Sequence, residues 1–136
     1  MIPRFQVKKV MSTKLHAVPT NVAARAVARL MASENIECVL VHDAGAYVGI
    51  ITETDIVKKV VGEDMDPAAV TAQDIMSYPI ASIEESASLE TAHEAMGGQR
   101  VRHLMVTKDG EPVGLLSVRS LLDAAYDWAL QMKRPS

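Results

Sequence analysis

The chain of 136 residues carries 14 Lys or Arg against 17 Asp or Glu, which gives a net charge of −3, and 49% of its residues are apolar. This length and composition exclude a disordered tail and indicate a globular protein able to bury a core. The acidic balance argues against a nucleic-acid-binding domain, because such domains concentrate positive charge on one face. Any bound anion must therefore meet local positive charge.

The sequence gives no sign of secretion, membrane insertion or metal binding. Cys38 is the only cysteine, so it forms no internal disulfide, and no paired Cys/His spacing indicates a metal site. No apolar run approaches the roughly 20 residues that span a bilayer, and the N-terminus lacks the apolar stretch of a signal peptide. We therefore expect a cytoplasmic protein.

In the first repeating part of the chain, a leading β segment at Val7 to Met11 precedes an amphipathic helix that begins after the capping residues Thr20-Asn21. Two apolar runs, 38–41 and 47–51, flank a Gly-containing turn and predict a β-hairpin. A second helix is expected from Thr54 to Val61. The predicted order is β-α-β-β-α.

The same order follows in the second half of the chain. A leading segment contains Ile75, a helix begins near Ser86 and ends at Gly97-Gly98, and a hairpin joins 104–106 to 113–116. A longer closing helix is expected from Arg119 to Met132.

These elements form an internal repeat at an offset of 65 positions, without a gap. Identical residues at this offset are Met11-Ser12 and Met76-Ser77, Val41 and Val106, Gly45 and Gly110, and Val48-Gly49 and Val113-Gly114.

Because repeats of about 60 residues bury little alone, the two copies are expected to pack together. The predicted fold is therefore α/β (α+β), with two pseudo-two-fold-related repeats packed through their sheets. The expected boundaries are 7–61 and 75–124 for the repeats, 62–74 for the connector and 125–136 for a helical extension.

These motifs resemble the cystathionine-β-synthase (CBS) domain family. In the first repeat the resemblance rests on Met11-Ser12 and on the Gly-x-x-Thr-x-x-Asp motif within Val48–Ile56. In the second repeat it rests on Met76-Ser77, Val101–Val106 and Val113–Leu122. The resemblance implies a tandem CBS pair, or Bateman module, of the stand-alone bacterial or archaeal type.

The resemblance implies a binding module rather than an enzyme. Family members bind AMP, ADP, ATP or S-adenosylmethionine in clefts between the repeats. In the family the motif Asp takes the ribose and the Thr or Ser hydroxyl reaches ribose or phosphate, roles that map to Asp55 and Thr52. A helix that starts after a strand also suits a phosphate, and a carboxylate suits ribose hydroxyls. The residues implied at this first site are Ile50, Thr52, Thr54, Asp55, Ser77, Ile80, Ala81, Val101, Arg102 and His103.

Within that set, the mapping places Ser77, Ile80 and Ala81 at the adenine and Arg102 at the phosphate. A guanidinium offers planar, fork-like donors to a phosphate, so one arginine supplies what the acidic net charge does not.

A second, pseudo-symmetric site is implied at Ser12, Leu15, His16, Ile36, Glu37, Ser117, Arg119 and Ser120. Ser120 stands where the family has its ribose-binding Asp, and a hydroxyl does not replace a carboxylate in accepting two ribose hydroxyls. Glu37, opposite Arg102 in the repeat alignment, would also repel a phosphate. We expect this site to be weak, empty or differently selective, with one ligand bound per chain.

Structural interpretations stand beside these binding roles. Thr52 and Asp55 have the spacing of a capping box, in which two side chains satisfy free N–H groups at a helix start, and this role is compatible with binding. Arg102 and His103 fit a solvated strand edge equally well. Cys38 lies in an apolar run and is expected to be a buried, inert thiol.

The closing helix carries apolar residues that we expect along one face: Leu121, Leu122, Ala125, Trp128, Ala129 and Met132. This face either packs on its own domain or forms a homodimer contact, because Trp and Met are enriched in interface cores and Bateman modules commonly pair through helices.

Two functions stay open. The first is a sensor in which an adenosine ligand shifts the packing of the repeats and a protein partner reads the change. The second is a structural dimerisation scaffold with no physiological nucleotide. An enzyme is not expected, because the sequence has no Ser/His/Asp or Cys/His arrangement and no Gly-rich phosphate loop with its Lys.

Overall fold

The structure, a computed structural model, describes residues 4–133. The predicted β-α-β-β-α order occurs twice along the chain, which confirms the α+β fold class. The elements divide into two compact units, each with one three-stranded sheet. The central unit is Leu15–Ile80, and the terminal unit combines Met1–Lys14 with Ala81–Ser136.

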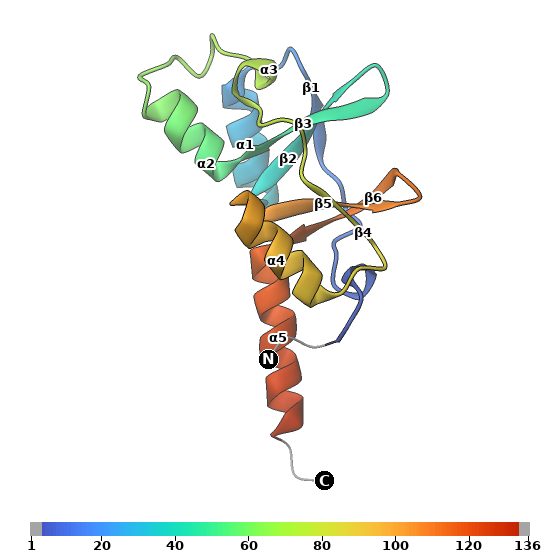
Figure 1. The fold of residues 1–136 in the computed structure, drawn as a ribbon. Coiled ribbons are helices and arrows are strands. Elements are labelled where there is room, and N and C mark those ends of the chain that lie inside the picture. The colour runs from blue at the N-terminus through green and yellow to red at the C-terminus, as the bar shows by residue number, and fades with distance from the viewer. Residues whose placement is uncertain (1–3, 134–136) are drawn as a thin grey trace. The chain divides into compact units, whose positions relative to one another are not determined.

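In the central unit the sheet order is β1-β2-β3, with β1 parallel and β3 antiparallel to β2 (Figure 1). The strands are β1 (Ala17–Pro19), β2 (Cys38–Asp43) and β3 (Ala46–Thr52). The helices are α1 (Ala24–Glu34), α2 (Glu53–Asp55), its π-helical continuation η2 (Ile56–Val61), and α3 (Ala72–Ile75). The hairpin turns through Ala44 and Gly45, both with positive φ, as its Gly-containing sequence predicted.

The terminal unit repeats this plan with the sheet order β4-β5-β6. Its strands are β4 (Ser82–Glu84), β5 (His103–Lys108) and β6 (Glu111–Ser117). Its helices are the 3-10 turn η1 (Val7–Lys9), α4 (Leu89–Gln99) and α5 (Val118–Met132). The predicted closing helix is confirmed through Met132, and residues 134–136 of the expected extension at 125–136 lie outside the described residues.

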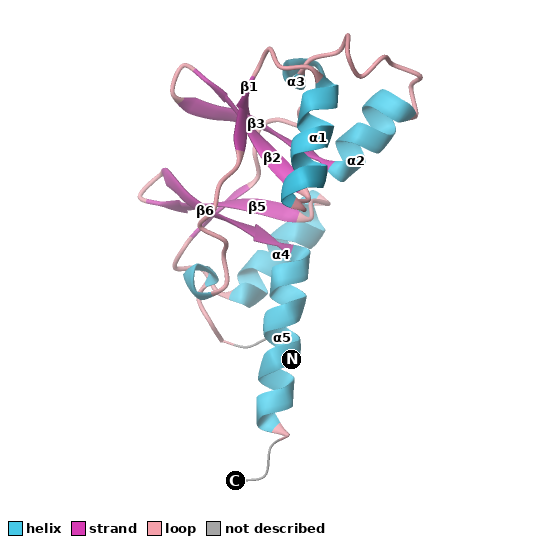
Figure 2. Ribbon diagram, turned by 180° about the vertical axis from the view of Figure 1, so that it is seen from behind, coloured by secondary structure: helices cyan, strands magenta, loops and turns pink. Residues whose placement is uncertain are grey.

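Each unit has its own apolar core. Figure 2 shows α1 and the helix formed by α2 and η2 on one side of the central sheet, and apolar residues of α1 and η2 join its core. Fully buried residues of the central core include Val27, Val39, Val41 and Ile51, and those of the terminal core include Leu89, Ala92, Leu104 and Leu116. Leu89, Ala92 and Met96 of α4 all face the terminal core.

The leading segment of each repeat pairs with the hairpin of the other repeat. In the central unit, the backbones of Ile50 and Ser77 exchange hydrogen bonds of 3.0 and 2.8 Å. In the terminal unit, Ser12 and Leu115 exchange bonds of 2.8 and 2.9 Å. The compact units therefore differ from the sequence repeats, because each contains the hairpin of one repeat and the Met-Ser segment of the other.

The predicted leading β segments were misplaced. Residues 7–9 form a 3-10 turn and Ile75 ends α3, whereas the leading strands are β1 and β4, several residues later. Apolar residues at Val7 and Ile75 suggested strands, but Val7 lies on a 3-10 turn and Ile75 on a short helix, and each side chain is buried in the core of its unit. Short apolar runs do not distinguish the two cases.

Two predicted helix ends also differ. The N-cap of α1 is Ala23, which makes no side-chain cap, rather than Thr20-Asn21. Gly97-Gly98 lie inside α4, which ends at Arg100 in the left-handed conformation with φ 56°. The backbone N–H of Arg100 still satisfies carbonyls of the last turn, so a left-handed arginine closes this helix in place of the expected glycine.

Candidate functional site

The start of α2 forms the capping box that the spacing predicted. The hydroxyl oxygen of Thr52 accepts from the backbone N–H of Asp55 at 3.4 Å. The Oδ2 atom of Asp55 accepts from the backbone N–H of Thr52 at 2.9 Å and from its hydroxyl at 3.3 Å. The structural role of both residues is thus realised at the point where β3 passes into the helix.

The other oxygen of Asp55 faces the leading segment of the second repeat. Asp55 Oδ1 accepts from the Ser77 hydroxyl at 2.9 Å and from the Lys59 ammonium at 2.8 Å. The Asp55 residue is only 5% exposed, and its carboxylate is fully hydrogen-bonded. A buried carboxylate is stable only when it is paired in this way.

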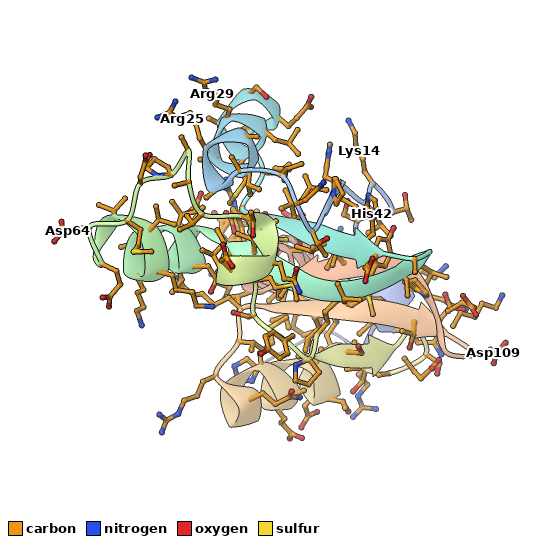
Figure 3. The ribbon with its side chains drawn as sticks, turned by 90° about the horizontal axis from the view of Figure 1, so that it is seen from above. Lys14, Arg25, Arg29, His42, Asp64 and Asp109 are labelled. Atoms are coloured by element: carbon orange, nitrogen blue, oxygen red, sulfur yellow. The ribbon has the colours of Figure 1, made fainter. Side chains whose placement is uncertain are left out.

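Lys59 was not predicted from the sequence. Its ammonium also donates to the backbone oxygen of Ile75 at 2.9 Å and to the Ser77 hydroxyl at 3.3 Å. By contrast, Arg25 and Arg29 extend from α1 away from the sheet (Figure 3). The position of Lys59, four residues after Asp55 on a predicted helix, was the signal available in the sequence.

Four of the first-site residues predicted from the sequence lie together in the central unit. Ile50 is 8% exposed, and its backbone pairs with that of Ser77. The Ser77 hydroxyl donates to the Asp55 carboxylate, which Thr52 also contacts. Thr54 is exposed on the first turn of α2, and Ile80 is half-buried at the end of the unit.

The other four predicted first-site residues lie in the terminal unit. The carbonyl of Ala81 accepts from the Met105 N–H at 2.9 Å, and His103 begins β5. Arg102 is exposed, and with Val101 it lines a pocket of about 360 Å³ beside the start of α5. That these four residues contact the same adenosine ligand as Asp55 stays a prediction from the sequence.

The second predicted site divides in the same way, and its terminal half contains hydroxyls where the first has a carboxylate. Ser117 accepts from the Ser120 N–H at 3.0 Å, and their hydroxyls are 3.0 Å apart. The Ser12 hydroxyl accepts from the Lys14 N–H at 3.3 Å. Arg119 is exposed on the first turn of α5. The remaining residues of this predicted site, all half-buried in the central unit, are Leu15, His16, Ile36 and Glu37.

The face predicted on α5 is divided between two environments. Leu121 is 3% exposed and Trp128 is half-buried, and both lie against their own unit. Leu122, Tyr126 and Leu130, spaced four residues apart, are 60%, 62% and 46% exposed. Of the predicted set, Leu122 and Met132 are exposed, and the exposed apolar stripe at four-residue spacing is Leu122–Tyr126–Leu130.

Other candidate chemistry is limited in the structure. Cys38 is half-buried rather than fully buried as expected. Desolvation, aided by Glu37, still raises the pKa of its thiol to about 12, which agrees with an inert thiol. Within residues 4–133, no group of three or more His, Cys, Asp or Glu side chains is placed to hold a metal ion. No helix of that part of the chain is long and apolar enough to cross a membrane.

Comparison with known proteins finds the CBS domain model matched twice, at residues 7–62 and 72–127. An uncharacterised 17.7 kDa protein in the bps2 3' region of Acidianus ambivalens is 30% identical over 134 residues, which cover 96% of this chain and 80% of that protein. Against two other curated relatives the chain spans only 43% and 23% of their lengths.

Solved structures are similar over nearly the whole chain. A putative signal-transduction protein with CBS domains from Burkholderia ambifaria matches with a TM-score of 0.82 and 26% identity, covering 96% of this chain and 95% of that one. A hexameric CBS-CP12 protein from bloom-forming cyanobacteria matches with a TM-score of 0.85 and 24% identity, covering 96% and 73%.

Proposed function

Because the chain belongs to the CBS-domain family and carries two copies of the domain, we propose that it is a regulatory module that binds an adenosine-containing ligand. The candidate ligands are AMP, ADP, ATP and S-adenosylmethionine. The proposed role is binding and signalling without catalysis, since the matched family and the relatives above carry CBS-domain or uncharacterised names.

The observation that carries this function is the environment of Asp55. A capping box alone does not require a buried carboxylate, because Thr71 and Asp74 form the same box at α3 with distances of 2.9 and 3.4 Å, and Asp74 is exposed. Asp55 is the buried charged side chain among the described residues, and it also reaches Ser77. A role beyond capping accounts for the difference.

In the proposed complex, Asp55 and Thr52 take the ribose hydroxyls, because a carboxylate accepts two donors at once. Ile50, Ser77 and Ile80 contact the adenine. Arg102 on the terminal unit contacts the phosphate, for which an exposed guanidinium supplies planar donors. Ser120 has no carboxylate to offer, so we expect one ligand per chain.

The signal is proposed to reach a protein effector in the cytoplasm, with the chain acting as a homodimer. The exposed stripe Leu122–Tyr126–Leu130 supports a helix-mediated contact, since partner-facing helices present apolar residues at this spacing. The same stripe favours the second candidate function, a dimerisation scaffold that binds no physiological nucleotide.

Thermal unfolding with each ligand separates these two functions. A ligand that binds only the native state must raise the unfolding temperature, and at a hundred times its Kd it adds about 2.7 kcal/mol. We expect a rise with at least one of AMP, ADP, ATP and S-adenosylmethionine, and none with uridine monophosphate. No rise with any adenosine compound at millimolar concentration would contradict the proposed function and leave the scaffold.

A further inference from the structure

The carboxylate proposed to accept the ribose is already occupied by the chain itself. Asp55 Oδ2 is held by Thr52, and Asp55 Oδ1 is held by the Lys59 ammonium at 2.8 Å and the Ser77 hydroxyl at 2.9 Å. A ligand hydroxyl that approaches Oδ1 meets these two donors. The Oδ2 bonds belong to the capping box that begins α2, so Oδ1 is the oxygen that can exchange partners without loss of the helix start.

Of the two donors on Oδ1, Lys59 is the one that connects separate segments. Its ammonium, on η2, joins Asp55 to the carbonyl of Ile75 at 2.9 Å and to Ser77 at 3.3 Å. The residues 75–77 are the segment whose backbone pairs with Ile50 in β3. Lys59 therefore ties the helical side of the unit to the leading segment of the second repeat. The Lys59 side chain is 41% exposed, so it can move into solvent when it is displaced.

The second repeat lacks this charge pair as a whole. At the offset of 65 residues, Ser120 replaces Asp55 and Ala124 replaces Lys59, while Val10 corresponds to Ile75. These three counterparts line a pocket of about 640 Å³ in the terminal unit. The leading segment whose carbonyl Lys59 contacts has a counterpart in both units, whereas a lysine four residues after the first residue of the pair is present only in the repeat that has Asp55 there. Lys9, Asp123 and Asp127 also line the terminal pocket, from other positions. The ammonium belongs with Asp55 rather than with the fold of the leading segment.

We infer that Lys59 is a displaceable internal counter-ion of the binding site. In the ligand-free protein it holds the Asp55 carboxylate and the Ile75–Ser77 segment together. Ribose hydroxyls take its place on Oδ1, and the segment loses this tie when the ligand binds. This role rests on the proposed function, and it makes Lys59 a positioning residue that sets both ligand affinity and the mobility of the leading segment.

Calorimetry with adenosine and AMP tests the displacement, with Lys59→Met compared with Lys58→Met. Lys58 is the exposed neighbour on η2. Because partly exposed ion pairs are weak, removal of the competitor should tighten adenosine binding about two- to fivefold, with the same factor for AMP, and Lys58→Met should change neither. Unchanged or weaker adenosine binding in Lys59→Met overturns the displacement. A loss confined to AMP also overturns it, since Lys59 would then contact the phosphate.

Hydrogen exchange of the ligand-free protein tests the tie. The Ser77 and Ile50 amides, which bond to each other's carbonyls, should exchange several-fold faster in Lys59→Met and at the wild-type rate in Lys58→Met. Equal rates in the two variants would overturn the tie. Failure of the proposed function has a different signature, because neither adenosine nor AMP would then bind the wild type or either variant.

Discussion

The side chain of Met76 occupies the space directly above Gly49. A Cβ atom at position 49 would lie under 3.0 Å from the sulfur and Cγ of Met76. Met11 covers Gly114 in the same manner in the terminal unit. The Met-Ser and Val-Gly pairs that define the repeat are therefore contact partners, each methionine packing on the glycine of the other repeat's hairpin.

Gly49→Ala should destabilise the protein by about 1–3 kcal/mol, because the added methyl group forces the packed Met76 side chain to move. Gly97→Ala is the matched control, since its Cβ would meet nothing within 4 Å inside α4. That control should stabilise by about 0.5–1 kcal/mol, as alanine is the better helix former. Urea unfolding of the three proteins measures both effects, and equal stability of Gly49→Ala and wild type would contradict the packing.

Cys38 should react slowly with thiol reagents in the native state. Its pKa of about 12, against 9.0 for a free thiol, leaves about a thousandfold less thiolate near pH 8. The higher intrinsic nucleophilicity of such a thiolate offsets part of this difference, so we expect labelling at least about tenfold slower than in denaturant. Native-state labelling as fast as in denaturant would contradict the raised pKa of the thiol.

The same shift predicts a pH dependence of stability. Between about pH 9 and 12 the folded state keeps the Cys38 proton while the unfolded state loses it, so this contribution to stability falls as the pH rises through that window. In Cys38→Ala, the free energy of unfolding should no longer show this part of the decline between about pH 9 and 12. Below pH 9 the Cys38 proton makes no pH-dependent contribution in either protein. Parallel decline of both proteins would contradict the raised pKa.

Ser120→Asp should supply the carboxylate that the second site lacks. The substitution also completes a capping box with Ser117 at the start of α5, so a modest gain in helix stability is expected as well. The control is Thr91→Asp, which places a carboxylate three residues after the capping Ser88 of α4. Both variants should gain stability, but only Ser120→Asp should raise the adenosine stoichiometry from one to two per chain. Binding of two adenosine molecules per wild-type chain would contradict the expectation that Ser120 disables the second site.

Tyr126→Glu should weaken the proposed homodimer, because it places a charge in the middle of the Leu122–Tyr126–Leu130 stripe. Gln131→Glu adds the same charge elsewhere on α5 and serves as the control. Sedimentation should give a dimer for the wild type and the control, and a monomer for Tyr126→Glu. A dimer that survives Tyr126→Glu would exclude this face as the contact.

Sequence patterns predicted the hairpins and the start of α2 well, because these depend on local residues. Gly45 and Gly110 have φ values of 81° and 82°, which suit a tight turn between apolar strands. The Thr52–Asp55 spacing likewise predicted a capping box that depends only on residues three positions apart.

What the sequence did not predict depends on contacts between distant segments. Residues 7–9 form a turn whose Val7 packs on the core rather than a strand that joins a sheet, and periodicity does not separate the two cases. Lys59 contacts Ile75 and Ser77, which lie 16 and 18 positions later in the sequence, so no local sequence pattern predicts these contacts. The burial of Asp55 likewise could not be predicted, because it depends on Ser77, which is distant in the sequence and donates to its carboxylate.

The most direct test of the proposed function is the affinity of Asp55→Asn and Asp74→Asn for the best adenosine ligand, measured by calorimetry. Both substitutions neutralise the carboxylate of a Thr-Asp capping box, and Asp55→Asn also removes the charge that pairs with Lys59, so thermal unfolding checks that each variant is folded. Because a hydrogen bond to a charged group contributes about 1.5–3 kcal/mol, Asp55→Asn should bind about ten- to a hundredfold more weakly. Asp74→Asn should bind like the wild type. Equal affinity of Asp55→Asn and wild type would contradict the assignment of Asp55 as the ribose acceptor.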